Sequence, residues 1–271
     1  MSDDLSVSKD VKASKLGDYF PYKAIHANYL INCSMRHKFI YVETPKVACS
    51  TIKRALQLIE LDGDLTKLPR AVHDRKLSPL ADPTNMPVSA DRLLTGDDFF
   101  RFGFVRSPYT RTLSCYIDKV LNKDAGGFFL RQLGCDPGAD LSLEKFLSII
   151  RDQADIDKDP HWAPQSYLLQ ISKVDYHFMG RFERIDRDLR VLFGHLRPDL
   201  RQAALGSKMD EHATHAGDKV RQFIGRRERD LIVEIYEKDF SDLSYSRNLG
   251  LRKLIEGIRW RKRPQRGIKL G

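Results

Sequence analysis

Residues 38–51 read KFIYVETPKVACST, and this stretch carries the clearest structural signal in the chain. Residues 38–44 are rich in β-branched and aromatic side chains, which predicts a short buried strand that stops at Pro45. The next apolar residues lie at positions i, i+3, i+4 and i+7, on one face of a helix: Ile52, Ala55, Leu56 and Ile59. The stretch therefore predicts a strand, a short loop and a helix.

The same arrangement recurs downstream. Residues 99–105 form a second apolar run, followed by Ser107 as a helix N-cap and Pro108 in the first helical turn. Residues 176–180 are a candidate third strand, and further helical patterns cover residues 143–150, 189–196 and 228–240. Alternating strands and helices are typical of an α/β fold, and we expect a P-loop-like central parallel sheet flanked by helices.

The composition predicts one globular domain over residues 1–271. Hydrophobic residues make up 41% of the chain and charged residues 31%, which excludes disordered and collagen-like classes. Residues 1–18 look like a flexible polar lead, and residues 250–271 form a basic extension. Residues 62–98 have little periodicity, and the glycines at 126–127 and 134–138 are expected to break the chain.

The positive charge is local. The segment 252–269 has eight basic residues and one acid, so it supplies +7 of the net charge of +9. It could bind an anionic surface, or it could be a solvated extension. No run approaches the ~18 apolar residues that span a bilayer, and residues 1–20 have no apolar core of the kind expected in a signal peptide. We expect a cytoplasmic protein that is not integral to a membrane, could touch one through this extension, and does not bind nucleic acid.

The loop at residues 44–51 is the first chemical signal. A loop that leaves a strand and opens a helix directs backbone N–H groups and the positive end of the helix dipole at one spot. Lys46 adds a full charge, and Ser50 and Thr51 add hydroxyl groups. This pattern favours a phosphate or sulfate site without the Walker glycines, but an ordinary turn with a surface lysine fits the loop equally well.

The second signal is FVRSPYTRTLSCY at residues 104–116. Arg106 lies at the end of the predicted strand, while Arg111 and Ser114 are three residues apart on one helical face. An arginine fork beside a hydroxyl suits a terminal phosphate. Taken alone, Arg106 would more often pair with a surface carboxylate.

Together, PKVACST at residues 45–51 and FVRSPYTRTLSCY resemble the paired signature of sulfotransferases that use 3′-phosphoadenosine 5′-phosphosulfate. The PKVAC form is most similar to the carbohydrate sulfotransferase branch. HWAPQ at residues 161–165, GRFE at 180–183 and the dipeptide at 188–189 also fit, and YEKDF at 236–240 is similar too, so the resemblance runs from about residue 38 to residue 240. It implies a sulfuryl transfer to a hydroxyl of a carbohydrate or glycan acceptor.

The resemblance also implies roles for individual residues. Lys46 would contact the oxygen that bridges sulfur and the 5′-phosphate. Arg106 and Ser114 would hold the 3′-phosphate, with Arg111 as a second candidate. The 5′-phosphosulfate would be held by the loop and its hydroxyls, namely Val47, Ala48, Cys49, Ser50 and Thr51. The transferred group carries less charge than a phosphoryl group, so we expect no metal requirement.

The reaction also needs a base for the acceptor hydroxyl. His73, in the long loop between the two motifs, is our first candidate, and His161, Glu43 and Asp74 are alternatives. His161 is also placed among the substrate-binding candidates. Trp162 could stack on a sugar ring or pack in the core, and Gln165 could contact the acceptor or make a buried hydrogen bond.

Two other classes compete with this interpretation. A nucleotide-binding phosphotransferase would use the same anion site, although the Walker pattern is missing. A noncatalytic polyanion-binding protein would depend on the basic extension instead.

Overall fold

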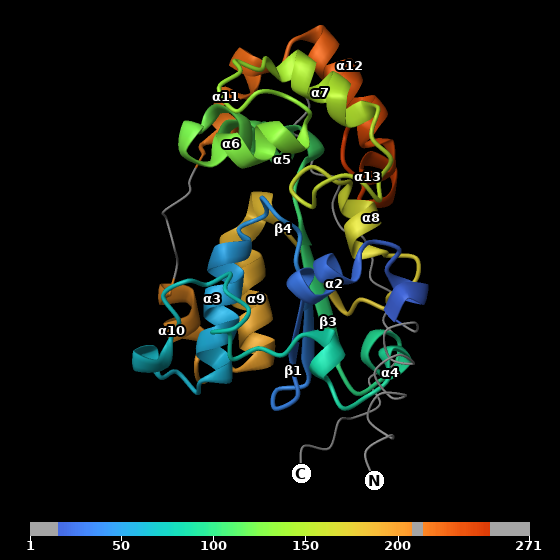
Figure 1. Ribbon diagram of the computed structural model, residues 1–271. Coiled ribbons are helices and arrows are strands. Elements are labelled where there is room, and N and C mark those ends of the chain that lie inside the picture. Colours follow the sequence, from blue (N-terminus) through green and yellow to red (C-terminus); the bar gives the residue numbers. More distant parts are fainter. Residues whose placement is uncertain (1–15, 208–213, 250–271) are drawn as a thin grey trace.

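A four-stranded sheet forms the centre of the molecule (Figure 1). The computed structural model describes residues 16–207 and 214–249. The strands lie in the order β1 (Ile31–Ser34), β2 (Phe39–Val42), β3 (Phe100–Val105) and β4 (Phe178–Arg181). β2, β3 and β4 are parallel, as expected, but β1 is antiparallel to β2, so the sheet is mixed rather than purely parallel.

Alternation along β2 explains the two layers of helices. Phe39 and Tyr41 pack on one face with the apolar sides of α3 (Cys49–Glu60) and α9 (Ile185–Leu196). Ile40 and Val42 face the other side, where the packed layer includes α2 (Ala24–Leu30) and α4 (Ala90–Leu94). Figure 1 shows these helices on opposite faces of the sheet. Successive strand residues point to opposite faces, so one apolar strand serves both cores.

A helical lobe covers the carboxyl ends of the parallel strands (Figure 1). Its apolar cluster is built around Phe146 and Trp162. Its helices are α5 (Pro108–Cys115), the π-helical turn η3 (Tyr116–Leu121), α6 (Lys123–Gln132), α7 (Leu143–Arg151), α11 (Ala216–Phe223) and α12 (Arg226–Ile235). The shorter elements are α8 (Gln165–Leu169), α10 (Arg201–Gly206), α13 (Glu237–Asp242), η1 (Leu65–Lys67), η2 (Pro83–Asn85) and η4 (Phe182–Arg184).

The structure corrects several expected boundaries. The helix expected over 228–240 is interrupted at Tyr236, which separates α12 from α13. The glycines at 126–127 lie inside α6 instead of breaking the chain. Helix α6 packs against η3, and such packing outweighs the ~1 kcal/mol that a helical glycine costs. Strand β1 was missed because it has only four residues and two of them, Asn32 and Ser34, are polar although they are buried.

The packed chain begins at the start of the described residues, where Leu16 is only 6% exposed. Residues 1–15 of the expected lead and the whole basic extension, 250–271, lie outside the described residues. Among the described residues, no helix combines the length and apolar character needed to cross a membrane.

Candidate active site

The loop between β2 and α3 opens towards the helical lobe. Lys46 and Ala48 both have left-handed backbone conformations, with φ of 69° and 56°. Ala48 is the N-cap of α3 and provides no side-chain cap. The first N–H groups of a helix have no partner within the helix and attract anions. The loop geometry therefore suits an anion at the start of α3.

Lys46 forms an ion pair across the site. Its Nζ lies 2.8 Å from Oδ2 of Asp118, which belongs to the π-helical turn η3. Asp118 also pairs with Lys119 at 3.0 Å. Burial would raise the pKa of Asp118, but hydrogen bonds and charge from the two lysines lower it to about 2. Asp118 is therefore ionised at neutral pH and shares the charge of Lys46.

Arg106 lies directly behind the same loop. Its Nη1 donates to the carbonyl oxygen of Lys46 at 3.0 Å, and its Nε donates to Oγ1 of Thr110 at 3.0 Å. The guanidinium carbon lies 3.9 Å from the ring centre of Phe182. Burial lowers its pKa to about 10, so the group stays charged at neutral pH. Within the described residues Nη2 has no hydrogen-bond partner, so it can serve a bound anion.

Ser114 is buried near the end of α5, where its Oγ accepts a hydrogen bond from Oγ1 of Thr214 at 3.0 Å. Thr110 and Ser114 are four residues apart in α5, so helical periodicity places them on one side of the helix, and Arg106, just before the helix, donates from Nε to Oγ1 of Thr110. This arrangement is compatible with a shared phosphate contact by Arg106 and Ser114.

Arg111 has a different position from the one expected. Its guanidinium donates to three main-chain carbonyl oxygens at 2.9–3.0 Å, and the side chain is 1% exposed. The acceptors are Pro45, Pro160 and Ala163. All three nitrogens are engaged, so we assign Arg111 to holding the anion loop against the loop 160–163 rather than to the cofactor.

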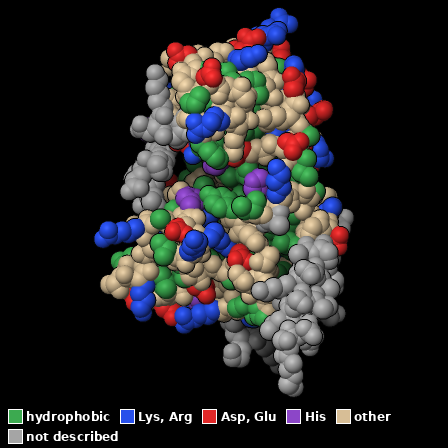
Figure 2. Space-filling view, in the orientation of Figure 1, with side chains coloured by type: hydrophobic (Ala, Val, Ile, Leu, Met, Phe, Trp, Pro, Cys, Tyr) green, Lys and Arg blue, Asp and Glu red, His purple; other side chains and the backbone are tan. Residues whose placement is uncertain are grey.

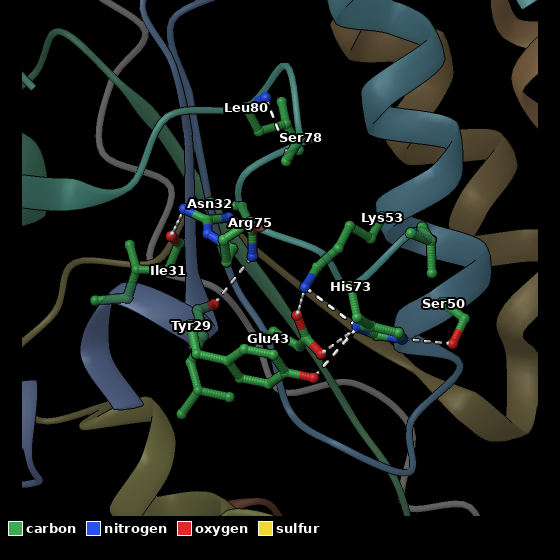
Figure 3. Close-up of polar contacts among 12 residues, drawn as sticks. Tyr29, Ile31, Asn32, Glu43, Ser50, Lys53, His73, Arg75, Ser78 and Leu80 are labelled. Atoms are coloured by element: carbon green, nitrogen blue, oxygen red, sulfur yellow. Dashed lines mark hydrogen bonds and ion pairs between the residues drawn. The ribbon is translucent and has the colours of Figure 1, made fainter. Parts of the chain in front are cut away.

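His73 reaches the anion loop from the long loop between the motifs. Its Nε2 lies 2.8 Å from Oγ of Ser50, at the first turn of α3 (Figure 3). Two contacts fix its neighbours: Gln57 donates to the carbonyl of Val72 at 3.0 Å, and Arg75 donates to Oδ1 of Asn32 at 2.6 Å. Figure 2 shows histidine side chains around a hollow between the helical lobe and the rest of the molecule.

The other predicted substrate residues separate into two groups. His161 is partly exposed, and its Nδ1 lies 2.6 Å from Oδ1 of Asp159, within hydrogen-bond distance. Trp162 is 2% exposed and packs edge-on against Phe146, so it is part of the core. Gln165 is fully buried and bonds to both the backbone N–H and the carbonyl of Arg106. Gln165 therefore positions Arg106 instead of contacting an acceptor.

One group of side chains has the composition of a metal site. Ligand atoms of Glu43, Cys49 and His73 lie within 4.8 Å of one another. However, the ammonium group of Lys53 already pairs with Glu43 at 2.5 Å and would repel a second cation. Burial, with the charge of Glu43, raises the pKa of the Cys49 thiol to about 12, so it is a neutral side chain at the start of α3. We assign this cluster no metal.

Sequence reasoning did not identify Asp118, Tyr29 or Lys53 as parts of the site. For Lys53 a signal was present, because Ser50, Lys53 and Gln57 form a polar stripe at i, i+3 and i+7 on an otherwise apolar helix. Asp118 and Tyr29 lie 72 and 44 residues from their partners Lys46 and His73. No local pattern indicates such contacts.

The fold and the candidate site describe an α/β protein with an anion-binding loop at the carboxyl end of its sheet, and comparisons with known proteins specify the family. The model described as "Sulfotransferase family" matches residues 30–246. The chain therefore belongs to the sulfotransferase family, whose members use 3′-phosphoadenosine 5′-phosphosulfate. No solved structure matches the chain significantly.

Several curated relatives are carbohydrate sulfotransferases. Carbohydrate sulfotransferase 14 of Mus musculus is 33% identical over 168 residues, which cover 57% of this chain and 43% of the relative. The Homo sapiens protein of the same name is 32% identical over 167 residues, with the same coverage. Carbohydrate sulfotransferase 9 of Homo sapiens is 24% identical over 233 residues, or 78% of this chain and 52% of the relative. The chain thus spans about half the length of these relatives.

Proposed function

We propose that this protein transfers a sulfuryl group from 3′-phosphoadenosine 5′-phosphosulfate to a hydroxyl group of a carbohydrate or glycan. The observation that carries the proposal is the convergence of Lys46, the uncapped start of α3 and Arg106 at one end of the sheet, with Nε2 of His73 beside Ser50. The names of the relatives support a carbohydrate as the acceptor.

The residues present fit this donor. The structure offers two separate anion sites, the Nη2 group of the buried Arg106 and the uncapped start of α3. One hydrogen bond, from Arg106 to the Lys46 carbonyl, joins them. The donor has two anionic ends, a 5′-phosphosulfate and a 3′-phosphate. We assign the first to Lys46 and the loop 47–51, and the second to Arg106 and Ser114.

Sulfuryl transfer needs charge neutralised on the leaving oxygen and a proton removed from the acceptor. Lys46 and the α3 N-terminus supply the positive charge, as metal ions do in many phosphoryl transfers. His73 supplies the base, because burial lowers its pKa and keeps the imidazole neutral near pH 7. His161, whose side chain is partly exposed, is our candidate for contacting the acceptor.

A transfer assay with radiolabelled donor tests the acceptor class. Neutral oligosaccharides, sulfated polysaccharides and simple phenols are offered in parallel, and labelled ATP is offered as a competing donor. We expect sulfate to appear on carbohydrate only, and no phosphate transfer from ATP. Sulfation of phenols alone would overturn the acceptor class, and phosphate transfer would favour the phosphotransferase class.

A further inference from the structure

A buried ion pair lies directly behind His73 and has no role in the reaction as described so far. Nζ of Lys53 and Oε2 of Glu43 are 2.5 Å apart, and their side chains are 0% and 1% exposed. Glu43 follows β2, and Lys53 is in the second turn of α3. Both side chains point at the His73 ring in Figure 3. Buried ion pairs are weak evidence for stability, so we asked what this pair does to its neighbour.

Both charges face the same ring nitrogen. Nδ1 of His73 lies 3.4 Å from Nζ of Lys53 and 3.7 Å from Oε1 of Glu43. The ammonium group can only donate a hydrogen bond, and the carboxylate can only accept one. Glu43 therefore favours a proton on Nδ1, and Lys53 disfavours it. The opposite nitrogen, Nε2, faces Ser50 at 2.8 Å.

The other close neighbours of the ring are uncharged. Oη of Tyr29, from α2, lies 3.4 Å from Nδ1, and burial raises its pKa well above the ordinary value. The Cys49 thiol is also protonated. Burial is the main cause of the lowered pKa of His73; Glu43 opposes it, and Lys53 and the more distant His161 and Lys119 add to it. Glu43 and Lys53 are thus the charges in direct reach of His73 among the described residues.

We propose that Glu43 and Lys53 act as a positioning pair that keeps His73 neutral, with its proton on Nδ1 and with Nε2 unprotonated towards Ser50, so that Nε2 can take a proton; this rests on the proposed role of His73 as the base. In the reaction, the acceptor hydroxyl gives its proton to Nε2 while its oxygen bonds to sulfur, and the bond from sulfur to the bridging oxygen breaks. The imidazolium that results keeps its Nδ1 proton towards Glu43, while Lys53 prevents it from forming too early.

We expect the removal of either charge to shift the pKa of His73, and the two shifts to have opposite signs. In Glu43→Gln the unpaired ammonium group of Lys53 should lower the pKa of His73. In Lys53→Met the unpaired carboxylate of Glu43 should raise it. A charge within ~4–6 Å commonly shifts a pKa by one unit or more. The double variant removes both charges and should bring the pKa back towards the wild-type value.

Nuclear magnetic resonance of histidine labelled with nitrogen-15 measures this directly in the full chain. The His73 signals are assigned by their loss in His73→Gln. We expect the Nδ1–H tautomer in the wild type and opposite pKa shifts in the two single variants. An Nε2–H tautomer in the wild type would overturn the proposal without any variant, even if a single variant does not fold. Shifts of the same sign, or no shifts, would also overturn it.

The dependence of kcat/KM on pH separates this inference from the proposed function. Activity should fall as pH drops through the pKa of His73, because the base must be unprotonated. The acidic limb should therefore move to higher pH in Lys53→Met and to lower pH in Glu43→Gln. If the resonances shift as expected but the limb does not, the positioning pair stands and His73 is not the base.

Discussion

Lys46 cannot contact a new anion fully while it is paired with Asp118. The pair is short, at 2.8 Å, and both side chains are largely buried. A hydrogen bond to a charged group contributes about 1.5–3 kcal/mol, so Asp118 competes measurably with any ligand of Lys46. This competition is a property of single residues and can be tested by changing one of them.

We expect Asp118→Asn to bind the nucleotide product, 3′,5′-adenosine bisphosphate, about tenfold or more tightly, since 1.4 kcal/mol corresponds to tenfold. The variant keeps the size of the side chain and removes its negative charge beside Lys46. Calorimetry measures the affinity, with the exposed Asp136→Asn as the matched control. Weaker binding in Asp118→Asn would mean that Asp118 helps to hold Lys46 in its productive position.

Arg106→Ala should weaken binding of the 3′-phosphorylated nucleotide far more than binding of the same nucleotide without that phosphate. The reason is that the free Nη2 contributes only when a 3′-phosphate is present. Calorimetry with both nucleotides separates the affinity due to the 3′-phosphate contact from the structural support that Arg106 gives to the Lys46 carbonyl. Equal losses for the two nucleotides would make Arg106 a purely structural residue.

At the scale of elements, the strand β2, its loop and α3 form the working unit. Left-handed backbone costs an L-residue roughly 1–2 kcal/mol, and the loop has two such residues, Lys46 and Ala48. The anion site is thus built on a strained turn whose ends are fixed by a buried strand and a buried helix.

We expect Ala48→Gly to stabilise the protein slightly, by about 0.5–1 kcal/mol, because glycine adopts a positive φ without strain. The matched control is Ala55→Gly in the interior of α3, which should lower stability by about 1 kcal/mol or more. Urea unfolding measures both free energies. A loss of stability in Ala48→Gly would show that the turn is not strained at this residue.

Local patterns predicted this unit because its signals are local. The strand of residues 38–44 and the helix face of Ile52, Ala55 and Ile59 need no information from the rest of the chain. The same reasoning selected Lys46, His73 and Arg106 as candidates. It offered Arg111 as a second candidate for the cofactor because spacing alone could not show the three carbonyls that surround the guanidinium.

What the sequence could not supply were contacts between distant segments. Gln165 was left open between an acceptor contact and a buried hydrogen bond, and its bonds to Arg106 cross 59 residues. The Asp239 carboxylate accepts from the backbone N–H groups of Gln165 and Ser166, which orients that loop. Such partners depend on how the lobe folds back on the sheet.

At the scale of the whole molecule, helices cover both faces of the sheet, and a helical lobe covers the carboxyl ends of its parallel strands (Figure 1). The basic extension lies outside the described residues, yet it supplies most of the net charge. We propose that it attracts an anionic acceptor, such as a sulfated polymer or a glycan on a membrane surface, by long-range charge.

Removal of residues 252–271 should leave donor affinity unchanged and raise KM for a polymeric anionic acceptor. The difference from the full chain should shrink with added salt, because the Debye length is only ~8 Å at physiological ionic strength. Steady-state kinetics with a polymeric and a small neutral acceptor measure the effect. A loss of nucleotide affinity on truncation would instead place the extension at the donor site.

Sulfate transfer from radiolabelled donor by the wild type and by Lys46→Ala tests the role of Lys46 directly. Loss of one donor to a developing negative charge typically costs ~10²–10³ in rate, so we predict a fall of that size in a protein that remains folded. The exposed Lys67→Ala should transfer at the wild-type rate. Near-normal transfer by Lys46→Ala would show that Lys46 does not stabilise the leaving oxygen and would contradict the proposed site.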